Sequence, residues 1–159
     1  MKILVSYFSA TDTTKKVAIN LSQSINADIY EIKPEVLYSS ADLNWNNKES
    51  RSSVEMRNLD FRPAIANNNA NIKDYDVIFI GFPIWWYVAP TIINTFMEGY
   101  DFSDKKVILF ATSGGSGFGK AVQNLKKSCS PSTIIKEGKV FSTWSSKDEV
   151  SNWVKSLKL

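Results

Sequence analysis

Strand-like runs and amphipathic, helix-like stretches alternate along this chain. Runs rich in β-branched and aromatic residues are typical of strands, whereas apolar side chains three and four positions apart indicate a helix with one buried face. The strands predicted on this basis cover residues 2–8, 28–32, 76–80, 106–111, 133–135 and 139–143. The predicted helices cover residues 15–25, 91–100, 119–129 and a final stretch that begins at Ser146, where Glu149 completes a capping box.

This alternation predicts an α/β fold built on a parallel sheet. The runs at residues 76–80 and 106–111 are apolar throughout, which is expected when helices cover both faces of a sheet. The 159 residues fit one domain, residues 1–159, with three layers and a doubly wound five-stranded sheet of order 2-1-3-4-5. Such sheets bind ligands beyond the carboxyl ends of their strands, so the loops after the first, third and fourth strands are the candidate site.

Residues 34–75 do not fit the alternation. A segment of this length is too long to lack secondary structure inside a compact domain, and its predicted short helices are Ala41–Trp45 and Glu49–Arg57. We expect the segment to fold over the binding edge of the sheet.

Composition narrows the chemistry. The chain has no histidine and a single cysteine, Cys129, which excludes an internal disulfide, Ser-His-Asp and Cys-His catalysis, and histidine metal sites. We therefore predict no metal site and a chemistry supplied by a cofactor. No apolar run reaches the roughly 18 residues of a membrane span, and no basic cluster is interleaved with aromatic residues. The expectation is a cytoplasmic protein with no membrane span and no nucleic-acid partner.

The loop after the first strand is rich in hydroxyl groups. It consists of Ser9, Ala10, Thr11, Asp12, Thr13 and Thr14 and leads into a predicted helix. Hydroxyls and unpaired N–H groups at a helix N-terminus form an anion site, so the loop is a candidate for a phosphate monoester. It lacks the Gly-Lys-Ser/Thr ending of a nucleoside-triphosphate loop. The alternative is that these hydroxyls only cap the helix.

The loop after the third strand is aromatic. Its candidate ligand contacts are Pro83, Ile84, Trp85, Trp86 and Tyr87. Three consecutive large aromatic residues at the end of a strand can stack on a flat conjugated ring. Packing against residues 34–75 would also bury them without a ligand.

The loop after the fourth strand is rich in glycine. Its candidate contacts are Thr112, Ser113, Gly114, Gly115, Gly117 and Phe118. Glycines let a backbone approach a ligand closely and present N–H donors, although a flexible hairpin would have the same composition. Together the three loops offer a phosphate cradle, an aromatic wall and backbone N–H donors. FMN fits all three, because it has a flat ring and a phosphate tail.

The chain resembles the flavodoxins over nearly its whole length. The resemblance rests on Gly-Phe-Pro-Ile-Trp-Trp at residues 81–86, on Gly-Gly-Ser-Gly at residues 114–117, and on segments 42–45 and 50–51. The flavodoxin phosphate pattern, Ser/Thr-x-Thr-Gly-x-Thr, falls on residues 9–14. The resemblance implies a flavodoxin-like fold, a non-covalent FMN with its phosphate in the first loop and its ring between the other two, and electron transfer between a reductase and an acceptor.

Two departures from the family carry information. Asp12 stands where flavodoxins usually have glycine, so its carboxylate would repel a phosphate and a positive φ would be strained. The side chain could instead turn outward and cap the helix. The chain is also less acidic than many flavodoxins, with a net charge of +3, so we expect different partners and a higher flavin potential.

An enzyme is the main alternative. Flavin-dependent quinone reductases are similar in two loops, because their Phe-Pro-x-x-Trp-Phe-x-x-Pro resembles residues 82–90 and their Thr-Gly-Gly-Ser-Gly resembles residues 113–117. This resemblance implies NAD(P)H and a quinone taking turns at the flavin, with Trp86 or Tyr87 shaping the pocket. A phosphorylated signalling receiver on the same fold is excluded, since the loops after the first and third strands lack its acidic residues.

Overall fold

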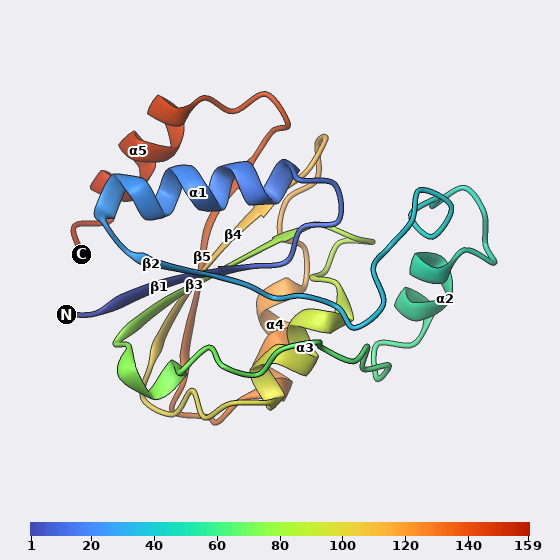
Figure 1. Ribbon diagram of the computed structural model, residues 1–159, viewed down its shortest axis with the longest axis horizontal. Coiled ribbons are helices and arrows are strands. Elements are labelled where there is room, and N and C mark those ends of the chain that lie inside the picture. Colours follow the sequence, from blue (N-terminus) through green and yellow to red (C-terminus); the bar gives the residue numbers. More distant parts are fainter.

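A five-stranded parallel sheet with helices on both faces forms the framework of the protein (Figure 1). The computed structural model describes residues 1–159, and the predicted strand order β2-β1-β3-β4-β5 is confirmed. The strands are β1 Ile3–Tyr7, β2 Asp28–Glu31, β3 Val77–Pro83, β4 Lys106–Thr112 and β5 Ile134–Phe141. The helices are α1 Thr13–Ile25, α2 Arg51–Arg57, α3 Thr91–Glu98, α4 Ala121–Leu125 and α5 Lys147–Ser156, with 3₁₀ turns at Ile72–Asp74 (η1) and Lys126–Ser128 (η2).

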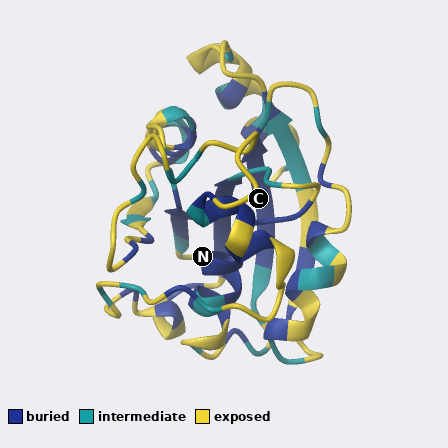
Figure 2. Cartoon of the chain, turned by 90° about the vertical axis from the view of Figure 1, so that its right-hand side faces the viewer, coloured by how far each residue is buried: buried dark blue, intermediate teal, exposed yellow.

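The sheet separates two hydrophobic cores, which explains why its central strands are apolar throughout. Phe79 and Phe110 point to the side covered by α1 and α5, whereas Ile78, Ile80 and Leu109 point to the side covered by α3 and α4. Figure 2 shows the buried residues concentrated in the sheet and on the inner sides of the helices. Each large side chain buried in this way contributes about 1.5–3 kcal/mol to folding.

Strand β5 corrects the prediction of two separate strands at residues 133–135 and 139–143. The structure has one continuous strand, with a bulge at Gly138 where Glu137 pairs with Leu109 and Lys139 pairs with Phe110. A Cβ at Gly138 would lie 2.2 Å from the Leu109 carbonyl oxygen, so only glycine allows this close passage.

Several helix boundaries also differ from the predictions. Ala41–Trp45 forms turns instead of a helix, and α2 begins at Arg51, where the Ser50 hydroxyl accepts the Ser53 N–H. The helix expected at residues 119–129 ends at Leu125 and continues as a 3₁₀ turn. The Ser146 cap is confirmed, since its hydroxyl accepts the Glu149 N–H at 3.1 Å.

The part of the middle segment around α2 lies beyond the carboxyl edge of the sheet, away from the main body, whereas the end of the segment returns to the amino edge, where the Tyr75 hydroxyl donates to Asp28 (Figure 1). The loops after β1, β3 and β4 end at the carboxyl edge, so the expected proximity of the segment to the candidate site is observed. No helix in the structure has both the length and the apolar character that a bilayer crossing requires.

Candidate functional site

The loop of residues 9–14 brings its hydroxyl groups to the beginning of α1. Thr11 and Thr13 have their hydroxyl oxygens 3.3 Å apart, and the Ser9 hydroxyl accepts the N–H of Lys15 at 3.2 Å. Thr14 differs, because its buried hydroxyl is hydrogen-bonded to that of Thr112 at 2.8 Å. The first two N–H groups of α1 remain available at this end of the helix, where its dipole favours an anion.

Asp12 adopts the glycine-like backbone that the sequence pattern demands. Its φ is 64°, in the left-handed region, and it occupies the N-cap position of α1. Its exposed side chain makes no capping hydrogen bond, so the alternative that Asp12 caps the helix is wrong. A non-glycine residue in this region costs about 1–2 kcal/mol, less for Asp than for most residues.

The aromatic loop after β3 contains a strained reverse turn. Trp86 and Tyr87 both have positive φ, 49° and 65°, while the N–H groups of Trp85 and Val88 each donate to the other residue's carbonyl, at 3.1 and 3.2 Å. This is a type I′ turn, which usually has Asn-Gly at its two central positions. Bulky residues there are genuine outliers, and such strain is concentrated at functional sites.

Gly119 supports this aromatic turn from the loop after β4. Its φ is +54°, and a Cβ at this position would lie 2.3 Å from the Tyr87 carbonyl oxygen. The same oxygen accepts the N–H of Lys120 at 3.0 Å. The turn therefore rests directly on the end of the glycine-rich loop.

Only some of the backbone N–H groups in the glycine-rich loop are free to bind a ligand. The N–H groups of Gly115 and Ser116 donate to the Ser113 hydroxyl at 3.2 and 2.8 Å, whereas those of Gly114 and Gly117 have no partner in the protein. A Cβ added at Gly114, Gly115 or Gly117 would meet nothing within 4 Å. These glycines thus line open space, as expected for a close backbone approach to a ligand.

The middle segment and the two later loops line an open cavity of about 580 Å³. Its lining residues are Leu43, Trp45 and Ser52 from the middle segment, Ile84, Trp85, Trp86 and Tyr87 from the aromatic loop, and Gly114, Gly115 and Ser116 from the glycine-rich loop. The Ser52 hydroxyl is buried and has no hydrogen-bond partner. Three segments far apart in sequence therefore form one largely apolar cavity.

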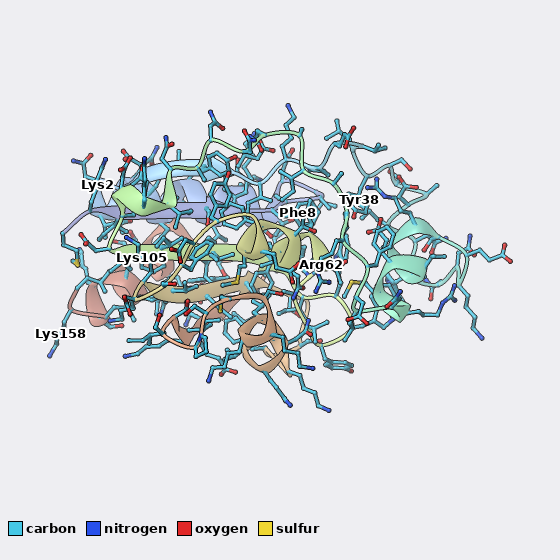
Figure 3. The ribbon with its side chains drawn as sticks, turned by 90° about the horizontal axis from the view of Figure 1, so that it is seen from below. Lys2, Phe8, Tyr38, Arg62, Lys105 and Lys158 are labelled. Atoms are coloured by element: carbon cyan, nitrogen blue, oxygen red, sulfur yellow. The ribbon has the colours of Figure 1, made fainter.

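Tyr38 fastens the middle segment to the sheet. Its ring packs edge-on against Phe8 at 5.7 Å and Trp85 at 5.5 Å between centroids, and Figure 3 shows Phe8 and Tyr38 near each other at this junction. The Arg51 guanidinium stacks on Tyr38 at 3.7 Å, and the Tyr38 hydroxyl donates to the buried Glu55 carboxylate. Burial, reinforced by Glu55, raises the pKa of Tyr38 well above its usual range.

Eleven of the seventeen predicted site residues fall into three groups. Ile84, Trp85, Trp86, Tyr87, Gly114 and Gly115 line the cavity. Thr11, Asp12 and Thr13 line a separate polar hollow of about 100 Å³ beside α1. Phe118, in contrast, is buried in the core against Phe82, where its role is packing, and the Thr112 hydroxyl is taken by Thr14.

Leu43, Trp45, Ser52 and Ser116 line the cavity but were not among the predicted site residues. Trp45 is an aromatic residue in a polar stretch of the sequence, and this was a usable signal for a site residue. In the structure it is 71% exposed. Ser52 offered none, because its position depends on how α2 packs. Ser50 and Arg51 do not line the cavity; Ser50 caps α2 and Arg51 binds Tyr38 and Glu55.

The cavity and the hydroxyl loop match the chemistry of a phosphorylated flat ring. The cavity has indole walls and open space beside its glycines, while the loop offers hydroxyls at a helix N-terminus. A doubly wound sheet with both features at its carboxyl edge has the architecture of the flavodoxin-like class.

This chain belongs to the flavodoxin family, which it matches over residues 2–157. A candidate flavoprotein from Bacteroides eggerthii DSM 20697 is 48% identical, covering 99% of this chain and 98% of that one, with a TM-score of 0.89. A second, from Bacteroides uniformis ATCC 8492, is 44% identical over 97% of each chain, with a TM-score of 0.90. A flavoprotein from Lactobacillus acidophilus NCFM, solved in complex with FMN, shares the fold at 24% identity, 96% and 98% coverage and a TM-score of 0.68. No curated protein matches the chain significantly.

Proposed function

We propose that the protein binds one FMN non-covalently and transfers electrons through it. The observation that carries this proposal is the placement of an indole-lined cavity and a hydroxyl-rich helix N-terminus at one edge of the sheet. Membership of the flavodoxin family supports it, and a protein of the same fold from Lactobacillus acidophilus was crystallised with FMN.

Each loop has a distinct part in this proposal. The hydroxyls of Ser9, Thr11 and Thr13, with the first N–H groups of α1, would hold the phosphate. Trp85 and Trp86 would cover the isoalloxazine ring. The free N–H groups of Gly114 and Gly117 suit the pyrimidine edge of the ring, and a peptide of the aromatic loop would meet the ring nitrogen N5.

The side chains around the cavity favour electron transfer over acid–base chemistry. The chain has no histidine, and no Asp, Glu, Lys or Cys lines the cavity, so FMN supplies the redox chemistry when bound. Trp86 is 45% exposed and Tyr87 is 67% exposed, which leaves this wall accessible to a partner protein. We therefore propose a cytoplasmic carrier between a reductase and an acceptor protein.

FMN binding is tested with the purified protein. We expect a yellow preparation that releases FMN in acid, or a colourless one that takes up FMN and quenches its fluorescence. Riboflavin is the matched control ligand, because it has the same ring without the phosphate. Thr11→Val should weaken FMN binding and leave riboflavin binding unchanged. A colourless protein that binds no FMN at saturation would overturn the proposal.

An FMN-dependent NAD(P)H:quinone oxidoreductase is the second candidate function. The observation that favours it is the solvent-accessible aromatic turn of residues 85–88, within a stretch that resembles the corresponding loop of such enzymes. Steady-state oxidation of NADH or NADPH with a quinone separates the two candidates. Appreciable turnover by the FMN-loaded protein supports the enzyme, whereas reduction in two resolved one-electron steps without turnover supports the carrier.

A further inference from the structure

A second cavity lies next to the one assigned to the flavin ring. Its volume is about 470 Å³, and its lining residues are Trp45, Lys48, Ser53, Met56, Arg57 and Trp86. Trp45 and Trp86 also line the first cavity, so the two spaces share their indole walls. Neighbouring positions on α2 divide between them, since Ser52 lines the first cavity and Ser53 the second.

The side chains of the second cavity combine flat apolar surface with positive charge. Two indoles and the Met56 thioether provide the apolar surface. Lys48 and Arg57 provide the charge, and neither forms an ion pair in the structure. Arg57 donates one hydrogen bond, to the Lys48 carbonyl at 2.8 Å, which holds the two residues together at the cavity.

No acidic side chain lines the second cavity to neutralise these cations. The carboxylate on the same helix, Glu55, is buried and engaged by Arg51 at 2.9 Å and by the Tyr38 hydroxyl. The first cavity, by comparison, is lined by glycines and contains no lysine or arginine. The two spaces therefore select for different ligands.

We propose that the second cavity binds a flat aromatic molecule carrying an anionic group. The rings would stack on Trp45 and Trp86, and the anion would accept hydrogen bonds from Lys48 and Arg57. The shared indoles would separate this ligand from the FMN ring. The presence of a flavin in the first cavity rests on the proposed function. An aromatic acid or a sulfonated ring has the required chemistry.

The test is calorimetric titration of the FMN-loaded protein with three probes. Naphthalene-2-sulfonate has the ring and the charge, naphthalene-2-methanol has only the ring, and cyclohexanesulfonate has only the charge. We expect naphthalene-2-sulfonate to bind with one site per chain and at least about tenfold more tightly than either control, because ring stacking and ion pairing each add to its affinity. Absent binding, or equal affinity for naphthalene-2-methanol, would overturn the proposal.

Variants locate the bound probe. Lys48→Gln and Arg57→Gln should each weaken naphthalene-2-sulfonate about two- to fivefold, as expected for exposed ion pairs, and leave naphthalene-2-methanol unaffected. Lys155→Gln removes an exposed lysine on α5 and should change nothing. Equal weakening by all three variants would mean unspecific attraction to positive charge and would contradict the assignment.

A competition measurement separates this inference from the proposed function. Naphthalene-2-sulfonate should bind without releasing FMN, which absorbance at the flavin band reports directly. Release of FMN would place the probe in the first cavity and overturn the inference alone. If the protein binds no FMN, the same titration on the FMN-free protein still tests the second cavity, so the failure of one proposal is not mistaken for that of the other.

Discussion

The hydroxyl groups of Thr14 and Thr112 lie 2.8 Å apart in the interior, although 98 positions separate the residues in sequence. Thr14 is in the first turn of α1 and Thr112 is the last residue of β4. The contact fastens the hydroxyl loop to the base of the glycine-rich loop. Two loops that would hold opposite ends of one ligand are thus fixed relative to each other before it binds.

Replacing both threonines by valine should lower the stability by less than the two single replacements added together. Thr14→Val or Thr112→Val leaves the other hydroxyl buried without a partner, which should lower the free energy of unfolding by about 1–3 kcal/mol. The double variant leaves no unpaired hydroxyl and should lose less than the sum of the two single losses. Urea denaturation of the four proteins measures this cycle. Strictly additive losses would show that the hydroxyls do not interact.

Asp12→Gly should tighten FMN binding. Glycine adopts the φ of 64° without strain, and the change removes a negative charge next to the expected phosphate. Asp12→Asn is the matched control, because asparagine tolerates the left-handed region and also lacks the charge. Equal tightening by both variants would identify charge repulsion as the cause. A fluorescence titration that gives equal or weaker FMN affinity for Asp12→Gly would end this hypothesis.

Replacing Trp86-Tyr87 by Asn-Gly should stabilise the fold and impair the site. Asparagine and glycine suit the two positive-φ positions of a type I′ turn, so the free energy of unfolding should rise by about 1–3 kcal/mol. Loss of the Trp86 indole should weaken FMN binding about two- to tenfold. Thermal denaturation of the FMN-free protein and FMN titration measure the two effects.

Tyr87→Gly alone is the control for the turn. It relieves one of the two strained residues and keeps the Trp86 indole, so it should gain part of the stability and retain more of the FMN affinity. If neither variant is more stable than the natural sequence, the turn is not under strain in solution.

The FMN-free protein should lose stability in alkali. Burial, with smaller contributions from Glu31 and Asp12, raises the pKa of Tyr7 from its ordinary value of 10.0 to about 12. The unfolded chain then releases this proton at a lower pH than the folded protein does, so the stabilisation is complete below pH 10.0 and is lost as the pH rises towards 12. Urea denaturation across this range should show a steeper pH dependence for the natural protein than for Tyr7→Phe. Identical slopes would contradict the assignment to Tyr7.

The sequence by itself determined the architecture. Apolar runs such as residues 76–80 are buried on both faces wherever a helix-covered parallel sheet contains them, so their spacing predicts strands and layers. The strand order followed from the doubly wound class that five such units fit. The carboxyl ends of such strands share one edge, which was enough to group the three loops before their paths were known. Hydrophobic periodicity is a local signal, because it repeats within each segment and marks the face to be buried without identifying the partner that covers it.

Only the tertiary structure decided which side chains form the site. Trp45 and Ser52 reach the cavity because Tyr38 packs on Phe8 and Trp85, a contact between remote segments that no periodicity encodes. Phe118 faces the core and the Thr112 hydroxyl faces Thr14 for the same kind of reason. Loop backbones carry no regular repeat, so the direction of each side chain depends on packing partners that are distant in sequence.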